Sequence, residues 1–269
     1  MKGIAVLPMY DFPELQDAHD ALWAALSLRM IEAGVTETPL RLTRHLEHFE
    51  AWGHPSLLFG QGCEYPLAES FADSIKLVAT PRYTAPGCEG ATYRSAIVVH
   101  EKNPAETLLD LRNRCCAINE ATSNSGMNLL RASIAPLANG TRFFESVVFS
   151  GSHRRSVDMV AEGEADVAAV DCVSLAHFRR LYPSSVAKLR VLAWTPASPS
   201  LPFITASATS GATLRILRSS LAHVLADPEL DSVRKRLLLD GVDLEPVAAF
   251  PEVQRLKRGA VELGYPVVC

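Results

Sequence analysis

The chain has 269 residues, of which 48% are hydrophobic and 21% are charged, so it can bury a sizeable core and is not disordered as a whole. Its net charge of −4 at pH 7 argues against a nucleic-acid surface, which would need a basic face, although a few local donors can still bind a small anion. Every apolar run falls well short of the ~20 residues that cross a bilayer, so we expect no membrane span.

The N-terminal part alternates short apolar runs with helical patterns. An apolar stripe from Leu15 to Met30 predicts a helix over 13–33 that ends at Gly34, and HFEAW predicts a second, shorter helix. The short apolar runs predict strands at 4–7, 40–42, 57–59, 75–79 and 95–99.

A second series of strands and helices begins at residue 115. Strands are expected at 115–118, 147–149, 167–170, 189–194 and 203–206. Helices are expected at 125–138, 154–163, 174–181, 212–226, 228–239 and 251–263. Strands that alternate with helices of this length predict an α/β fold with mixed, mostly parallel sheets flanked by helices.

Two Pro- and Gly-rich stretches, 80–92 and 195–202, bracket the middle of the chain. They favour two lobes with the ligand between them and hinge crossings near 80–92 and 190–200. The expected lobes are residues 1–90 plus 192–269 for lobe one and residues 91–191 for lobe two. The pattern equally allows one continuous domain with two long loops.

Small polar residues gather where strands are expected to lead into helices. One such corner reads Ser123–Asn124–Ser125–Gly126, and the next reads Ser150–Gly151–Ser152–His153. The strand DVAAVD ends on Asp171. Successive corners of a parallel sheet share one edge, and helix N-termini present unpaired N–H groups, so these corners predict a converging anion cradle. The simpler alternative is that each residue only caps its helix.

Several separated segments resemble the substrate-binding proteins of phosphate, phosphite and phosphonate ABC transporters. The segments are TYRSAIVVHEKNP, TLLDLRNRCCAINEATSNSGMNLLR, VVFSGSHRRSVDMVAEGEADVAAVD and LRVLAWTPASPSLPFI. The resemblance implies a two-lobe type 2 periplasmic binding fold that closes around a phosphorus oxyanion. It implies ligand contacts at Tyr93, Ser123, Ser125, Gly126, Ser152, His153 and Asp171. From lobe one, Tyr10 and Gln61 are the candidate contacts, because they lie near the ends of its own strands.

We therefore expect a monomeric solute-binding protein with a small anionic ligand and an ABC-transporter permease as its partner. The resemblance implies a periplasmic location, but the opening MKGIAVLPMYDFPEL shows no secretory pattern, so a cytoplasmic location stays open. Two alternatives remain: an enzyme on the same fold, of the type that makes the pyrimidine precursor of thiamine, and a cytosolic ligand sensor.

Neither a cofactor nor a metal is expected. His45 and His48, with His54 nearby, offer too few ligands for a zinc site, and no P-loop, G-x-S-x-G or H-E-x-x-H motif occurs. The six cysteines include no C-x-x-C pair. Cys63 and Cys88 lie in Gly-rich loops, where they either form a disulfide or remain as thiols.

Overall fold

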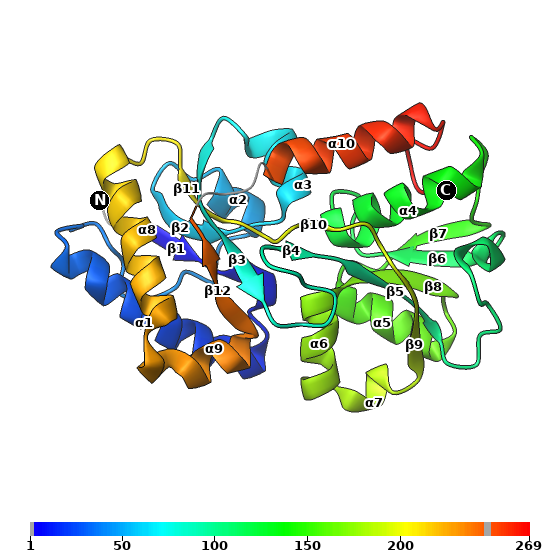
Figure 1. Cartoon of the computed structure of the whole chain (residues 1–269), viewed down its shortest axis with the longest axis horizontal. Helices are drawn as coiled ribbons and strands as arrows, with labels where there is room; N and C mark the ends of the chain where they lie inside the picture. The colour runs from blue at the N-terminus through cyan, green and yellow to red at the C-terminus, as the bar shows by residue number, and fades with distance from the viewer. Residues whose placement is uncertain (1–2, 245–248) are drawn as a thin grey trace. The chain divides into compact units, whose positions relative to one another are not determined.

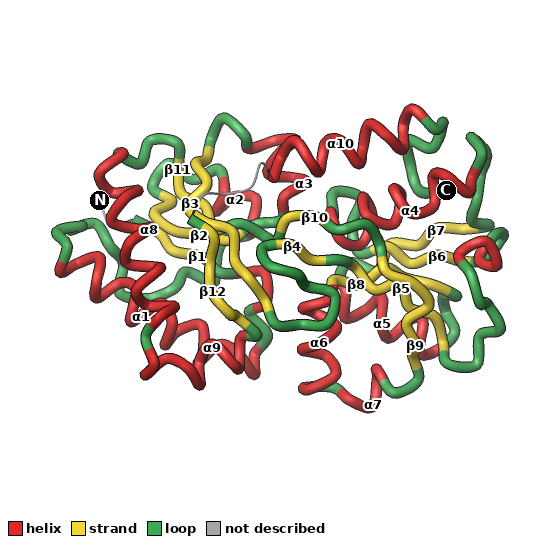
Figure 2. The backbone as a smooth tube through the Cα atoms, in the orientation of Figure 1, coloured by secondary structure: helices red, strands yellow, loops and turns green. Residues whose placement is uncertain are grey.

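The computed structural model describes residues 3–244 and 249–269 of the chain. The chain forms two compact units, each built from two or more separate stretches. Unit 1 comprises Met1–Thr84 and Pro199–Ala249, and unit 2 comprises Ala85–Ser198 and Phe250–Cys269. Each unit holds one five-stranded sheet with its own helices (Figures 1 and 2).

The sheet of unit 1 has the strand order β1-β2-β11-β3-β12. β1 runs parallel to β2, β11 runs antiparallel to both of its neighbours, and β12 runs antiparallel to β3. The strands are β1 (Ile4–Val6), β2 (Leu57–Gln61), β3 (Ile75–Tyr83), β11 (Phe203–Ala206) and β12 (Leu239–Asp243).

Three main helices complete unit 1, and α1 packs against both of the others. They are α1 (Gln16–Glu32), α8 (Gly211–Ala226) and α9 (Asp231–Leu237). Shorter turns are η1 (Pro8–Tyr10), η2 (Pro13–Leu15), α2 (His48–Trp52), α3 (Glu64–Pro66), η3 (Leu67–Phe71) and η6 (Pro228–Leu230). The core stacks Trp23 on Phe59 and Phe59 on Phe203, with ring centroids 5.7 and 5.1 Å apart, so it joins α1 to the central strands.

The sheet of unit 2 has the order β7-β6-β8-β5-β9. β6 runs parallel to β7 and β8, whereas β5 runs antiparallel to β8 and β9. The strands are β5 (Ser95–His100), β6 (Cys115–Ile118), β7 (Ser146–Phe149), β8 (Val167–Asp171) and β9 (Leu189–Trp194). A separate two-stranded sheet pairs β4 (Thr92–Tyr93) with β10 (Ser198–Pro199).

Helices lie on both faces of the second sheet. The chain steps from β6 outward to β7 and then back across β6 to β8, and the helices of these two connections, α4 and α5, lie on opposite faces of the sheet (Figure 1). The helical elements of unit 2 are η4 (Leu108–Leu111), η5 (Asn124–Asn128), α4 (Leu129–Ala138), α5 (His153–Glu162), α6 (Cys172–Leu181), α7 (Pro183–Val186) and α10 (Ala249–Glu262). Within the described part of the chain, no helix combines the length and the apolarity that a membrane span requires.

The α/β prediction with mixed sheets and flanking helices is confirmed, but one predicted strand is wrong and one predicted helix extends two residues too far. Residues 40–42 form no strand; the Thr43 N–H instead donates a single backbone hydrogen bond to Ala5, at 2.7 Å. The helix predicted over 228–239 ends at Leu237, because Leu238 takes a left-handed conformation with φ of 57°. The chain then enters β12, whose Asp and Gly residues give a weak strand signal.

The C-terminal segment belongs to unit 2, whereas the sequence prediction placed all of 192–269 in lobe one. Hydrogen bonds explain the difference. The backbone N–H groups of Phe143 and Phe144 both donate to the Cys269 carbonyl, and the Arg131 guanidinium donates to the Pro266 carbonyl. These bonds hold the end of the chain against α4 and against the segment that leads into β7. Hydrophobic periodicity predicts helices and strands, but it does not predict such long-range contacts.

Candidate functional site

The topology of unit 2 brings the three predicted corners to one edge of its sheet. β7, β6 and β8 are parallel, so the residues that follow them leave the sheet on the same side. β5 runs the opposite way and starts at this edge, where Ser95 pairs with Asp171. Tyr93, two residues before Ser95, therefore also belongs to this edge.

A hydrogen bond joins the two serine corners directly. The Ser125 hydroxyl lies 2.7 Å from His153 Nε2. Ser123 Oγ accepts a bond from the Gly126 N–H at 3.0 Å and lies 3.4 Å from Ser125 Oγ. Four of the residues predicted to bind the ligand thus form one contiguous polar cluster.

The first corner is a buried turn of π-helix, η5, which leads into α4. Asn124 donates to Tyr93 Oη at 3.1 Å and to Ser198 Oγ at 2.9 Å, and Asn128 donates to Asn124 Oδ1 at 2.9 Å. The Ser95 hydroxyl donates to the Ser125 carbonyl at 2.9 Å. Sequence reasoning missed this supporting set of Ser95, Asn124, Asn128 and Ser198, although two asparagines in the first turn of a predicted helix were a signal for it.

Gly126 is required by close packing. A Cβ at this position would lie 1.8 Å from Asn119 Oδ1 and 3.2 Å from His153 Cε1, so any side chain would collide with the cluster. Asn119 Oδ1 and His153 Nδ1 are both buried and make no hydrogen bond with the described residues. Buried polar atoms ordinarily have partners, so these two suit a site that receives a polar ligand.

Burial lowers the pKa of His153 to about 4, so its imidazole is neutral near pH 7. A neutral ring carries one N–H. With that hydrogen on Nε2, His153 donates to Ser125 Oγ, and the Ser125 O–H is then directed to another acceptor, such as an anionic oxygen. This arrangement supplies a hydrogen-bond donor without introducing a cation.

The remaining unit 2 candidates also serve as helix caps. Ser152 Oγ accepts from the Arg155 N–H at 3.1 Å, at the start of α5. Asp171, which is buried, accepts from the Ser174 N–H at 2.7 Å, at the start of α6. Capping, the simpler alternative, is therefore present at both residues, and the Ser152 hydroxyl can still donate a hydrogen bond.

Tyr10 and Gln61 lie together in a buried cluster of unit 1. Gln61 Nε2 donates to Tyr83 Oη at 2.8 Å and to the Leu201 carbonyl at 3.1 Å. The Tyr10 ring meets the Tyr83 ring edge-on, with centroids 5.4 Å apart. Both amide hydrogens of Gln61 are thus used within unit 1, and a ligand role for Tyr10 or Gln61 stays a prediction.

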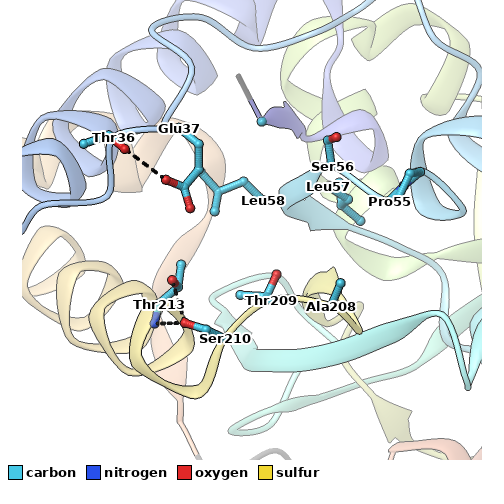
Figure 3. A pocket seen from close by; sticks show the side chains of 11 residues that line it. Thr36, Glu37, Pro55, Ser56, Leu57, Leu58, Ala208, Thr209, Ser210 and Thr213 are labelled. Atoms are coloured by element: carbon cyan, nitrogen blue, oxygen red, sulfur yellow. Dashed lines mark hydrogen bonds between the residues drawn. The ribbon is translucent and has the colours of Figure 1, made fainter. Parts of the chain in front are cut away.

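A hollow of about 670 Å³ opens at the other edge of the unit 1 sheet, where β1 and β2 begin (Figure 3). Glu37 lines one side, and Ser210 and Thr213 line the other. Ser210 already accepts from the Thr213 N–H at 3.0 Å as the cap of α8. Among the described residues that line this hollow, none is Lys, Arg or His and one is a carboxylate, so it suits an anion poorly.

No candidate metal site is found in the part of the chain that the structure describes. No group of three or more His, Cys, Asp or Glu side chains there is arranged to hold an ion.

Comparison with known proteins identifies the family. Residues 4–247 match the family model described as ABC transporter, phosphonate, periplasmic substrate-binding protein. The chain belongs to this family. The phosphonate-binding family consists of transporter components rather than enzymes, so the assignment also favours a binding protein over the enzymatic alternative. The resemblance drawn from the sequence segments is confirmed.

Solved structures show the same fold at low sequence identity. XAC2383 from Xanthomonas citri, bound to chloride ion, has a TM-score of 0.75 and 16% identity, covering 97% of this chain and 98% of that one. A binding protein component of an ABC phosphonate transporter, PA3383 from Pseudomonas aeruginosa, has a TM-score of 0.75 and 13% identity. The match covers 98% of this chain and 88% of that one. PhnD1 from Prochlorococcus marinus, in complex with methylphosphonate, has a TM-score of 0.74 and 14% identity. The match covers 97% of this chain and 98% of that one. No curated protein is similar enough in sequence to match the chain.

Proposed function

We propose that this phosphonate-binding family member binds a small phosphorus oxyanion, of the phosphonate, phosphite or phosphate type, for an ABC transporter. The observation that carries the proposal is the 2.7 Å contact between Ser125 and His153, which unites the two serine corners. The proposal also follows the family, whose members are transporter substrate-binding proteins, and one similar structure that holds methylphosphonate.

The cluster would bind an oxyanion through neutral donors. Ser125 and Ser152 offer hydroxyls that can donate to an anionic oxygen. The two arginines that follow His153 in the chain are already engaged: Arg154 pairs with Asp158 at 3.1 Å, and Arg155 pairs with Glu162 and Glu164. Charge-assisted hydrogen bonds from hydroxyl and amide groups, rather than ion pairs, would then supply the affinity.

Asp171 gives the proposed site its selectivity. A buried carboxylate beside an anion is unfavourable unless it accepts a hydrogen from the ligand or pairs with a cationic group on it. We propose that Asp171 accepts the P–O–H hydrogen of a protonated oxyanion or pairs with an ammonium group of an aminoalkyl phosphonate. The Asp171→Asn variant would then change the ranking of ligands or the pH dependence of binding, and unchanged affinities across ligands and pH would contradict this role.

The biological setting follows from the family and is likewise a proposal. The protein would act in the periplasm as a monomer and would deliver its ligand to a membrane permease.

Calorimetry and thermal shift with purified protein test the binding function. Methylphosphonate, phosphite and phosphate are the candidate ligands, ATP is included because XAC2383 has also been solved with ATP bound, and sulfate is the control anion. A ligand present at 100 times its Kd stabilises the folded state by about 2.7 kcal/mol, a clear rise in melting temperature. If none of the phosphorus oxyanions binds more tightly than sulfate, the proposal is wrong.

A matched pair of serine variants locates the site. Ser125→Ala removes the hydroxyl that His153 contacts, and we expect affinity to fall by roughly 10- to 100-fold, the equivalent of one charge-assisted hydrogen bond. Ser219→Ala is the control, because Ser219 lies on an exposed part of α8 and its hydroxyl donates to the Ile216 carbonyl at 3.0 Å. If the two variants bind the ligand with equal affinity, the serine cluster is not part of the binding site.

A further inference from the structure

Two cysteines that are distant in the chain lie side by side in unit 2. Cys88 is in the loop that opens unit 2, and Cys172 is the first residue of α6. Their Sγ atoms are 3.4 Å apart. A disulfide bond measures about 2.05 Å, so the sulfurs need to approach each other by only about 1.4 Å to form one.

The backbone around both cysteines is already held in place. The Cys88 N–H donates to the Ala85 carbonyl at 3.0 Å, which closes a tight turn, and the Cys172 N–H donates to the Arg94 carbonyl at 3.2 Å. Glu89 and Thr92 exchange two further backbone bonds at 3.0 and 3.1 Å. The remaining approach of the sulfurs therefore requires side-chain rotation rather than movement of the backbone.

Gly87 explains why the loop lies so close to α6. Its φ is 104°, and a Cβ there would lie 2.6 Å from Trp194 Cζ3 and 3.0 Å from Cys172 Cβ. The loop thus packs on Trp194 at a point where no side chain fits, and this contact sets Cys88 beside Cys172.

We propose that Cys88 and Cys172 form a disulfide bond when the protein meets a thiol–disulfide oxidant. In the first step the Cys88 thiol loses its proton, and its sulfur attacks one sulfur of the oxidant, so a mixed disulfide forms and one thiol leaves. In the second step the Cys172 thiol loses its proton, and its sulfur attacks Cys88 Sγ, so the mixed disulfide breaks and the second thiol leaves. Two electrons and two protons pass to the oxidant, whose disulfide becomes two thiols.

The environments of the two sulfurs decide this order. Cys88 is half-buried and can meet a reagent, whereas Cys172 is only 1% exposed. The hydrogen bond with Cys88, together with burial, raises the pKa of Cys172, so that thiol does not react first with the oxidant. In the second step its proton passes to the thiolate that leaves the mixed disulfide. Cys88 is therefore the residue that meets the oxidant, and Cys172 is the residue that resolves the mixed disulfide.

The bond would tie the loop before β4 to the residue that follows Asp171. β4 carries Tyr93, so the link would connect two elements that hold candidate ligand contacts. A disulfide between residues this far apart in the chain restricts the unfolded state strongly, and we expect the oxidised protein to melt about 5–10 °C higher than the reduced protein.

Peptide mapping of the wild-type protein is the decisive experiment. The protein is incubated with glutathione disulfide or with dithiothreitol, alkylated with iodoacetamide and digested with trypsin. We expect the oxidised sample alone to yield peptide 83–94 linked to peptide 156–179 and to lose two alkylatable thiols. Six alkylated cysteines after oxidation, a stable glutathione adduct on Cys88, or a link from Cys88 to any other cysteine would each overturn the proposal.

Two single variants separate the pair from the other thiols. Cys88→Ser changes a half-buried loop residue, and we expect it to remove both the linked peptide and the rise in melting temperature on oxidation. Cys63→Ser, which changes a cysteine of unit 1, should leave both unchanged. If Cys63→Ser removes the thermal effect, or if Cys88→Ser keeps it, the assignment to Cys88 and Cys172 is wrong.

Discussion

The two units use nearly the same sheet but place different chemistry at its edge. In unit 2, β6, β8, β5 and β9 follow one another as parallel, parallel, antiparallel and parallel strands, and β1, β2, β11 and β3 repeat this order in unit 1. In unit 2, Asn119 follows β6, Ser150 follows β7, and β8 ends on Asp171. Unit 1 ends them near Tyr10 and Gln61, which join Tyr83 in a buried cluster. The comparison shows that the backbone topology supplies an edge, and that the residues just beyond each strand decide what the edge can bind.

The largest effect is expected at Asn124, which holds the polar edge of unit 2 together. Asn124→Ala would leave Tyr93 Oη, Ser198 Oγ and Asn128 Nδ2 without the bonds that they now make with it. Because several buried polar groups lose a partner at once, we expect the free energy of unfolding to fall by about 3 kcal/mol and oxyanion affinity to fall with it. Urea denaturation measures the free energy of unfolding, and calorimetry measures the affinity. If the variant loses no more unfolding free energy than an ordinary surface substitution does, the Asn124 network does not support the polar edge of unit 2.

Gly126 gives the next largest effect. The new Cβ of Gly126→Ala would meet Asn119 Oδ1 at 1.8 Å, and such overpacking costs about 2 kcal/mol of stability. Asn119→Ala in the same chain removes the clashing atom, so the double variant should recover most of the stability. Gly259→Ala is the matched control, since a Cβ there meets nothing within 4 Å. Equal losses from the two glycine variants would contradict the close-packing argument.

The sequence predicts the strands and the serine corners of unit 2, but it does not predict the hydrogen bonds that support them. The strands at 115–118 and 189–194 are predicted with their observed bounds, because each is a mainly apolar run bounded by polar residues. The serine corners could be paired from the sequence, since parallel strands share an edge. The support from Asn124 could not, because its bonds to Tyr93 and Ser198 join residues up to 74 positions away. β12 was missed because a left-handed Leu238 has no sequence signal.

Tyr83 tests the unit 1 side of the comparison. Tyr83→Phe removes the hydroxyl oxygen that accepts from Gln61 Nε2 but keeps the ring that packs on Tyr10. We expect a loss of about 1.5 kcal/mol in the free energy of unfolding, because a buried amide hydrogen is left without its acceptor. Urea denaturation checks the loss. A variant as stable as the wild type would mean that the Gln61–Tyr83 bond does not hold the aromatic cluster together.

His153 gives the smallest effect, and its sign follows from the direction of the pKa shift. Burial lowers the pKa of His153 from 6.5 to about 4 in the folded protein. As the pH falls below 6.5, the unfolded chain binds a proton that the folded chain takes up only near pH 4, so the folded state loses stability across that window. Above 6.5 both states are neutral at this residue, and it makes no contribution. The residues before His153 are exposed and water screens the ring in part, so we expect a loss on the order of 1 kcal/mol.

Replacing His153 by Gln isolates this contribution, because glutamine can still donate to Ser125 but does not titrate. The difference in free energy of unfolding between wild type and His153→Gln should shift by about 1 kcal/mol in favour of the variant between pH 7.5 and pH 5. If the difference between His153→Gln and wild type stays constant over this pH range, the ring is not kept neutral by burial. His153 would then become positively charged as the pH falls, beside Ser125. The unit 2 site would contain a cation, and the proposed difference between its neutral donors and the aromatic cluster of unit 1 would be wrong.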